Sequence, residues 1–207
     1  NLIFKNLGNE ILNKKHDGAF LELSGRLAFS SDSFVVSPIF FKGGNIGELA
    51  VFGTVNDISM CGAEPKYLSL SFIIEEGFAM EDFEKIIHSI KLATEKTGVQ
   101  IVTGDTKVVE RGKGDKIYIN TSGIGIIYDN VKIGIEYIKQ NQTIIINRDI
   151  ASHGMAIMSE REGLKFDSEI LSDTKNLNFE IKKLIENFGE KIHFLRDATR
   201  GGLASVL

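Results

Sequence analysis

The clearest feature of the hydrophobic pattern is a helix over Met80–Thr97. Its apolar and small positions recur every three or four residues, which is the spacing of a helix that buries one face. These positions are Phe83, Ile86, Ile87, Ile90, Ala93 and Thr94. Acidic residues in the first turn and Gly98 after the last turn support the bounds. Weaker patterns of the same period predict helices from Ile46 onward, near His153–Glu162 and near Asn178–Asn187.

Other segments have the alternation or composition of β-strands. The longer strands are predicted at Lys66–Glu75, Gln100–Val109 and Lys116–Tyr128. Two strand segments, Arg26–Ser30 and Ser33–Val36, are predicted around a polar break at Ser31 and Asp32. A short buried strand is predicted at Thr143–Asn147, and a last strand at Ile192–Leu195. Strands mixed with long helices indicate an α/β (α+β) protein.

The polar stretch Lys139–Gln142 is the best candidate for a domain boundary. It divides a first domain, residues 1–140, from a second, residues 141–207. The chain starts at Asn1 and ends inside an apolar run at Leu207, so we expect it to be part of a longer protein with an incomplete second domain.

Composition narrows the class of protein. Of the 207 residues 43% are apolar and 25% are charged, which is typical of a globular protein. The net charge of −4 argues against a nucleic-acid partner, because binding to phosphates needs a basic surface. Cys61 is the only cysteine, so no disulfide can form within the chain, and no apolar run is long enough to span a membrane. We expect a cytoplasmic protein with no membrane partner.

Four aspartates stand beside glycine or small residues, or at breaks in apolar segments. They are Asp32, Asp57, Asp105 and Asp197. Each has a simple structural alternative: Asp57 as a solvent-facing helix residue, Asp32 and Asp105 as turn residues, and Asp197 as a helix N-cap. Taken together, carboxylates near exposed backbone amides are what a magnesium–nucleotide site requires. The sequence therefore predicts such a site, although it identifies no catalytic acid or base.

Glycine-rich segments support nucleotide binding without the common fingerprints. Gly43-Gly44-Asn45, Gly104 and Gly201-Gly202 each precede or interrupt an element where backbone amides could receive phosphate. The sequence contains neither a P-loop nor a Gly-x-Gly-x-x-Gly motif, so the P-loop and Rossmann classes are excluded.

Five strings resemble the HypE family of hydrogenase maturation proteins. They are SDSFVV at 31–36, PIFFKGGNIG at 38–47, GTVNDI at 53–58, VTGDTKVV at 102–109 and RDATRGG at 196–202. The Asn-Asp pair followed by Gly-Ala-x-Pro at 62–65 is shared with the wider superfamily of aminoimidazole ribonucleotide synthetase. The resemblance extends from about Arg26 to the end of the chain.

The resemblance implies a PurM-like two-domain fold whose N-terminal sheet forms a barrel across a homodimer. ATP would lie beside that sheet with its phosphates held through Mg²⁺. Carried over by position, Asp32, Asp57, Asp105 and Asp197 become metal ligands. The positions implied to bind the nucleotide are Asn56, Gly104, Thr106 and Lys107.

The implied activity is that of a carbamoyl dehydratase, which supplies the cyanide ligand of [NiFe]-hydrogenase. A partner, HypF, places a carbamoyl group on the family's C-terminal cysteine, and ATP-dependent dehydration converts it to a thiocyanate. HypC- and HypD-type maturation proteins are further implied partners. The acceptor cysteine is not among the 207 residues, because Cys61 lies in an interior segment.

Two alternatives remain open at this point. One is a small-molecule synthetase or kinase of the same fold, such as selenophosphate synthetase or thiamine-monophosphate kinase. The other is a non-catalytic scaffold that docks maturation partners.

Overall fold

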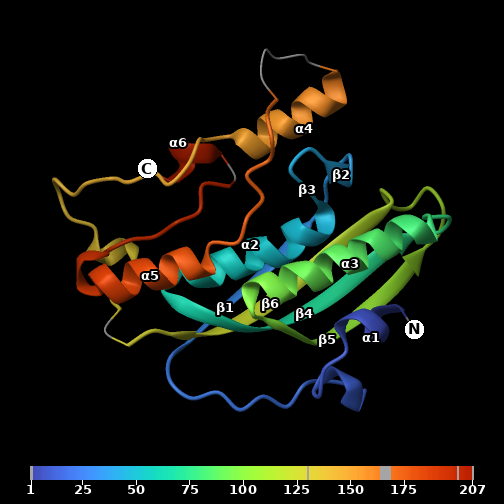
Figure 1. Ribbon diagram of the computed structural model, residues 1–207, viewed down its shortest axis with the longest axis horizontal. Helices are drawn as coiled ribbons and strands as arrows, with labels where there is room; N and C mark the ends of the chain where they lie inside the picture. The colour runs from blue at the N-terminus through green and yellow to red at the C-terminus, as the bar shows by residue number, and fades with distance from the viewer. Residues whose placement is uncertain (1, 130, 164–168, 200, 207) are drawn as a thin grey trace.

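A four-stranded open sheet organises the first part of the chain (Figure 1). The computed structural model describes residues 2–129, 131–163, 169–199 and 201–206. The strands lie in the order β1 (Leu27–Phe34), β6 (Ile117–Ile127), β4 (Ala63–Glu75) and β5 (Gln100–Val109). β6 runs antiparallel to both of its neighbours, whereas β4 and β5 are parallel and are connected through α3 (Met80–Thr97). The parallel pair needs this crossover, because a tight turn can join only antiparallel strands.

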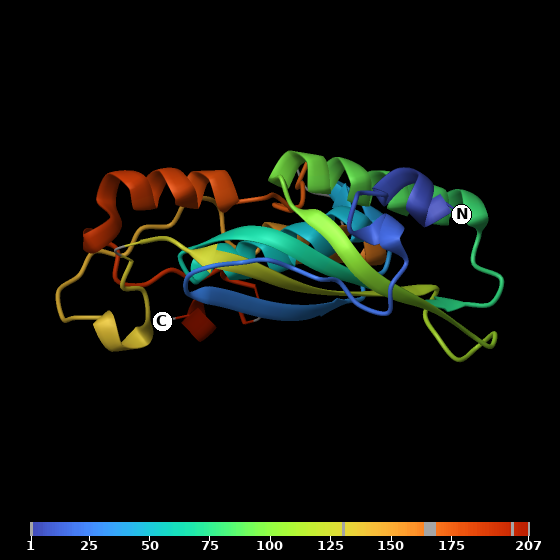
Figure 2. The same cartoon turned by 90° about the horizontal axis from the view of Figure 1, so that it is seen from below.

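Two helices cover one face of the sheet, which we call the inner face (Figure 2). α2 (Ile46–Met60) begins where the Asn45 side chain accepts hydrogen bonds from the backbone N–H groups of Gly47 and Glu48. α3 ends at Gly98, whose φ of 76° favours glycine. The core between helices and sheet contains Ile58, Leu68, Phe72, Ile86, Ile90 and Ile119. α2 approaches β6 closely, since a Cβ on Gly123 or Gly125 would lie only 2.5 to 2.6 Å from the Ile58 side chain.

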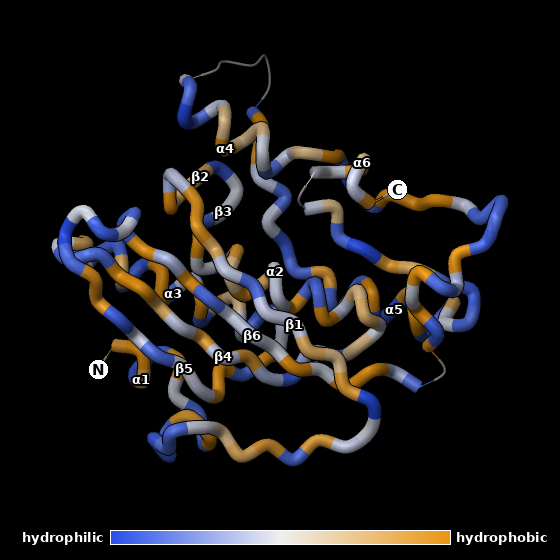
Figure 3. The backbone as a smooth tube through the Cα atoms, turned by 180° about the vertical axis from the view of Figure 1, so that it is seen from behind, coloured by the Kyte–Doolittle hydropathy of each residue, from blue (hydrophilic) through white to orange (hydrophobic). Residues whose placement is uncertain are grey.

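The opposite, outer face of the sheet carries no helix (Figure 3). Phe29 is 70% exposed there, and Leu27 and Ile73 are each 44% exposed. A row of hydroxyl groups crosses the same face, because Ser31 and Ser122 share a hydrogen bond of 2.8 Å and Ser69 donates to the Ser122 carbonyl. The outer face therefore mixes apolar and polar groups that are open to solvent in one copy of the chain.

The remaining elements are short or lie beyond the sheet. At the N-terminus and around α2 these are α1 (Leu2–Leu7), η1 (Leu12–Lys14), β2 (Phe40–Phe41) and β3 (Gly44–Asn45). After β6 follow η2 (Ile135–Tyr137), α4 (Ser152–Glu162), α5 (Asn178–Phe188), η3 (Gly189–Lys191) and α6 (Gly202–Val206). α5 buries Ile181 and Ile185 against Val131 and forms a second, smaller apolar cluster. Among the described residues, no helix combines the length and the apolar character that crossing a membrane requires.

The structure confirms most of the predicted elements and the mixed α/β class. The α3 bounds agree with the prediction, and the long strands, α4 and α5 agree to within a few residues. The predicted break at Ser31 and Asp32 is wrong, because β1 runs through both residues. Its polar residues sit on a regular two-residue alternation, and Ser31 and Asp32 simply point to opposite faces.

Two predicted strands are absent from the part of the chain that the structure describes. Residues 143–147 form no strand and are exposed, with Ile145 87% exposed, because no described element faces this apolar run. Residues 192–195 also form no strand, and Ile192 and Leu195 instead pack against the α5 cluster. The domain boundary near residue 140 stays a prediction.

Candidate nucleotide and metal site

Three aspartates far apart in the sequence converge at the inner face of β1. Asp32 lies on β1, Asp57 on α2, and Asp197 on the extended segment that follows α5. The carboxyl groups of Asp57 and Asp197 are close enough to share a hydrogen bond, and the charge of Asp32 also acts on Asp197. Ser30 completes the group, because its hydroxyl donates to Asp57 Oδ2 at 2.7 Å.

The local sequence explains why these side chains meet. The alternation along β1 turns Ala28, Ser30, Asp32 and Phe34 toward the helices. Gly53 lets α2 approach this strand, because a Cβ there would lie 2.8 Å from the Phe34 ring and 3.8 Å from Asp32 Oδ2. Asp57 follows Gly53 by one helical turn and so faces the same strand.

Negative charge accumulates at this site. The pKa of Asp197 is raised to about 6, first because burial penalises its charged form and then because the Asp57 carboxylate lies beside it. Burial also raises the pKa of the nearby Cys61 thiol, and the charge of Asp57 adds to this effect. A bound cation would relieve the repulsion between these carboxylates.

The donor set fits Mg²⁺ in the form that this ion takes beside nucleotides. Within the described ranges no three His, Cys, Asp or Glu side chains form a group that could hold a metal ion by itself. Mg²⁺ commonly binds one or two protein carboxylates and completes its octahedron with phosphate oxygens and water. Asp57 and Asp197 are the two carboxylates that the structure brings into contact.

Asp105 lies apart from the other three aspartates. It is on β5, at the opposite edge of the sheet from β1, and its residue pairing with Ser71 turns it to the outer face. Three strand spacings, about 14 Å, separate these two edges. Lys107 forms an ion pair with Asp105 at 2.9 Å, and Lys107 together with the Thr106 N–H lowers the pKa of the exposed Asp105 carboxyl.

The predicted nucleotide-binding positions fall in two places. Gly104, Thr106 and Lys107 are exposed on β5, and Gly104 is needed there because a Cβ would lie 1.9 Å from the Leu70 carbonyl oxygen. Asn56 lies on α2, where its side-chain amide binds the backbone of Lys175 and Leu177. Their roles in binding a nucleotide stay predictions.

Ser30 is the residue that the sequence did not single out. A continuous strand would place Ser30 on the same face as Asp32, two residues further on. The predicted strand break at Ser31 and Asp32 removed this indication. Arg200, part of the RDATRGG string, lies outside the described residues. Asp197 is not an N-cap, because α6 begins only at Gly202.

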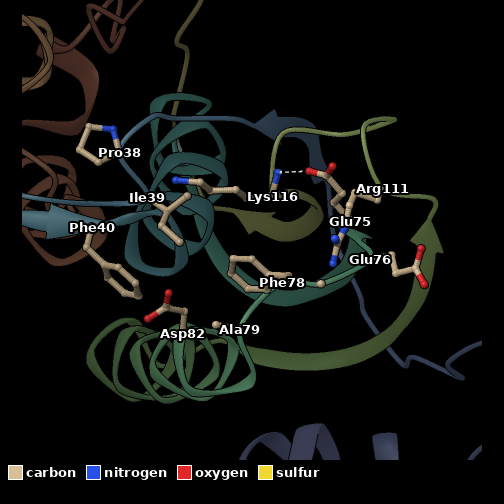
Figure 4. A pocket seen from close by; sticks show the side chains of 11 residues that line it. Pro38, Ile39, Phe40, Glu75, Glu76, Phe78, Ala79, Asp82, Arg111 and Lys116 are labelled. Atoms are coloured by element: carbon tan, nitrogen blue, oxygen red, sulfur yellow. Dashed lines mark hydrogen bonds between the residues drawn. The ribbon is translucent and has the colours of Figure 1, made fainter.

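A hollow of about 550 Å³ lies away from the aspartates, near the start of β6 (Figure 4). Glu75 and Arg111 line it together with Phe78 and Lys116, and Glu75 accepts hydrogen bonds from the backbone N–H groups of Gly112 and Lys116. Its described lining residues include none of the four aspartates. We therefore place the candidate site at Asp57 and not in this hollow.

The fold agrees with that of a known class of protein. The model of the AIR synthase related protein family, N-terminal domain, matches residues 15–127, and the chain belongs to this family. Within it, the chain is 46% identical over all 207 residues to carbamoyl dehydratase HypE of Bradyrhizobium diazoefficiens. It spans 60% of that relative's length.

Solved structures give the same result. A hydrogenase maturation protein HypE in complex with ATP superposes with a TM-score of 0.96 at 48% identity, covering 100% of this chain and 62% of the other. The structure of a HypE–HypF complex matches with a TM-score of 0.86 at 50% identity, covering 100% of this chain and 67% of the other. The resemblance to HypE seen in the sequence is confirmed.

Proposed function

We propose that this chain forms the ATP-binding portion of a HypE-type carbamoyl dehydratase. The observation that carries the proposal is the contact of Asp57 with Asp197, two carboxyl groups 140 positions apart in the sequence. It is supported by the similarity of the whole chain to a HypE that binds ATP. The chain spans about three fifths of its curated relatives, so the activity belongs to the longer protein.

The proposed reaction converts a thiocarboxamide on a C-terminal cysteine into a thiocyanate. The carboxamide oxygen attacks the γ-phosphorus of ATP, and ADP leaves. The C–O bond then breaks with release of phosphate, while the nitrogen gives up its two protons and forms the C≡N bond. Phosphorylation is needed because an amide oxygen is otherwise a poor leaving group.

The residues of this chain would hold the phosphates in place. Asp57 and Asp197 present carboxylate oxygens, Ser30 orients Asp57 by its hydrogen bond, and Asp32 adds negative charge beside them. Mg²⁺, when bound, offsets the charge of the transferred phosphoryl group. The raised pKa of Asp197 indicates that this carboxyl takes up a proton easily when no cation is near.

We also propose that the outer face pairs with a second copy. β1 and β5 are the edge strands of the described sheet, and edge strands usually need a partner or a cover. Joining β1 of one copy to β5 of the other would close an eight-stranded barrel around the exposed Phe29 and the serine row. This arrangement would bring the partner subunit's β5 edge, which carries Asp105, alongside β1.

The partners follow from the same relatives. A HypE was solved in complex with HypF, so we propose a HypF-type carbamoyltransferase as the partner that supplies the carbamoyl group. HypC- and HypD-type proteins are proposed as later recipients on the strength of the sequence resemblance. The proposed second domain, from residue 141, would complete the fold in the longer protein.

Carbamoyl-dependent ATP hydrolysis by the full-length protein tests the proposal. The wild type is expected to hydrolyse ATP only when its C-terminal cysteine is carbamoylated. Asp57→Asn is expected to lower this rate at least 100-fold, in line with the loss of a group that acts on transition-state charge. Asp17→Asn, which changes an exposed aspartate that is not one of the described site residues, is the matched control and should behave as the wild type. Hydrolysis that ignores the carbamoyl group would contradict the proposal.

A further inference from the structure

Residues 169–177 form an extended segment beside α2, which we call the strap (Figure 1). It leads into α5, and the return segment after α5 carries Asp197. α2 is therefore contacted by two segments of the chain, one that precedes α5 and one that follows it. One arm is the strap and the other is the return segment, residues 192–199.

The first fastening of the strap is at the β2–β3 hairpin. The Ser172 N–H donates to the Lys42 carbonyl at 2.9 Å, and the Ser172 hydroxyl shares hydrogen bonds with His153 Nδ1 and the Thr174 hydroxyl. Gly43 permits this contact, because a Cβ there would lie 2.7 Å from the Ser172 nitrogen. Ser172 is buried, so these bonds are shielded from water.

The second fastening is Asn56, about 16 Å further along α2. Its Nδ2 donates to the Lys175 carbonyl at 2.9 Å, and its Oδ1 accepts from the Leu177 N–H at 2.8 Å. These two backbone groups point to the same side of an extended chain, as they do toward a neighbouring strand. One amide side chain thus satisfies a donor and an acceptor of the strap at once.

An apolar cluster connects the strap with the return segment. Leu177 and Met60 of α2 both pack against the cluster around Ile181 and Ile185. Ile192 and Leu195 pack against the same cluster. Leu195 stands two residues before Asp197. If the strap detaches from Asn56, the packing of this cluster weakens, and the position of Asp197 becomes less well fixed.

We propose that Asn56 is a positioning residue, which fastens the strap to α2 and through the α5 cluster holds Asp197 against Asp57. This differs from the role that the sequence resemblance implies, in which Asn56 contacts the nucleotide. The consequence for ATP rests on the proposed function, whereas the mechanical part does not. Asn56 and Asp57 are adjacent on α2, so the same helical turn contacts both the strap and the return segment.

Hydrogen exchange and Mg–ATP affinity, measured on the full-length protein, test this role together. Asn56→Ala is expected to speed exchange about 10-fold in residues 171–177 and also in residues 192–199, because local opening becomes easier. Mg–ATP affinity is expected to fall about 5- to 10-fold. Ser172→Ala should give the same pattern more weakly, and it covers the case in which Asn56→Ala fails to fold. Asn187→Ala removes an exposed amide that donates to the Lys183 carbonyl within α5, and it should change neither quantity.

Two results would overturn the assignment. A loss of ATP affinity with unchanged exchange in both arms would make Asn56 a direct nucleotide contact. Faster exchange in the strap alone, with residues 192–199 and ATP affinity unchanged, would remove the coupling to Asp197. A wild type that binds no ATP would refute the proposed function, and the exchange of residues 192–199 would still decide the role of Asn56.

Discussion

Asp197 and Asp105 are the same residue type in opposite surroundings. Asp197 lies against Asp57, and burial and like charge raise its pKa to about 6. Asp105 is exposed on an edge strand, and Lys107 and a backbone N–H lower its pKa. Negative charge accumulates around Asp197 with no cationic side chain described beside it, whereas the Lys107 ammonium group already neutralises Asp105. In the proposed function the metal is held at the β1 edge, and β5 of the other copy brings Asp105 to that edge.

Mixing two inactive variants is the strongest way to break this comparison. Asp57→Asn and Asp105→Asn should each lose carbamoyl-dependent ATP hydrolysis in the full-length protein. If sites are shared between copies, mixed dimers contain one intact site, and an equal mixture should recover about a quarter of the wild-type rate. The assay is ATP turnover after refolding or co-expression of the two variants.

The same mixture has a clear contrary outcome. If Asp105 acted within its own copy, each protomer of a mixed dimer would lack one ligand, and no activity would return. A fully active Asp105→Asn variant would show that Asp105 has no part in the site. Either result would contradict the shared barrel.

The pH dependence of stability sharpens the comparison at a smaller scale. A carboxyl with a raised folded-state pKa contributes stability below its unfolded pKa, near 3.8, and this contribution is lost as the pH rises through about 6. In metal-free buffer, the melting temperature of Asp197→Asn should therefore rise relative to that of the wild type as the pH is raised from 4 to 7. The expected gain is about 2–4 °C, or roughly 1 kcal/mol, since the carboxyl is only partly buried.

Asp105→Asn should have the opposite sign. Its lowered pKa contributes stability above the unfolded value, and this contribution is lost as the pH falls. The Asn variant should thus melt slightly below the wild type at pH 7, and this difference should shrink as the pH falls. Thermal melts of both variants and the wild type across this pH range make the measurement. A gain for Asp197→Asn that is equal at pH 4 and pH 7 would contradict the assigned cause.

The smallest expected effect belongs to Ser30. Ser30→Ala removes a charge-assisted hydrogen bond to Asp57 and should weaken Mg–ATP binding about 3- to 10-fold. Ser31→Ala is the matched control, because Ser31 is the next residue on β1 and faces the other side of the sheet. Calorimetric titration of both variants measures the difference. Equal affinities in the two variants would show that Ser30 does not orient Asp57.

Periodicity predicted the elements that bury a face, and it failed where burial depends on partners elsewhere. The α3 stripe from Phe83 to Ala93 gave the correct helix because the repeat is local. Ile144–Ile146 looked like a buried strand, yet these residues have no described element to pack against. Tertiary context, which the local pattern does not contain, decides such cases.

The sequence pattern predicted only part of the candidate site. The clustering of aspartates beside small residues pointed to Asp57 and Asp197, which the structure brings together. Ser30 was missed because its role depends on which face of β1 meets α2. The two hydrogen bonds between the Asn56 side chain and the strap could not be foreseen either, since its partners are backbone groups about 120 residues away.

Binding of Mn²⁺–ATP, followed by the electron paramagnetic resonance of Mn²⁺ in full-length protein, tests the central claim most directly. The wild type should bind the complex, and Asp57→Asn and Asp197→Asn should each weaken it at least 10-fold while Asp17→Asn leaves it unchanged. Wild-type affinity in both site variants would show that the converging carboxyls hold no cation.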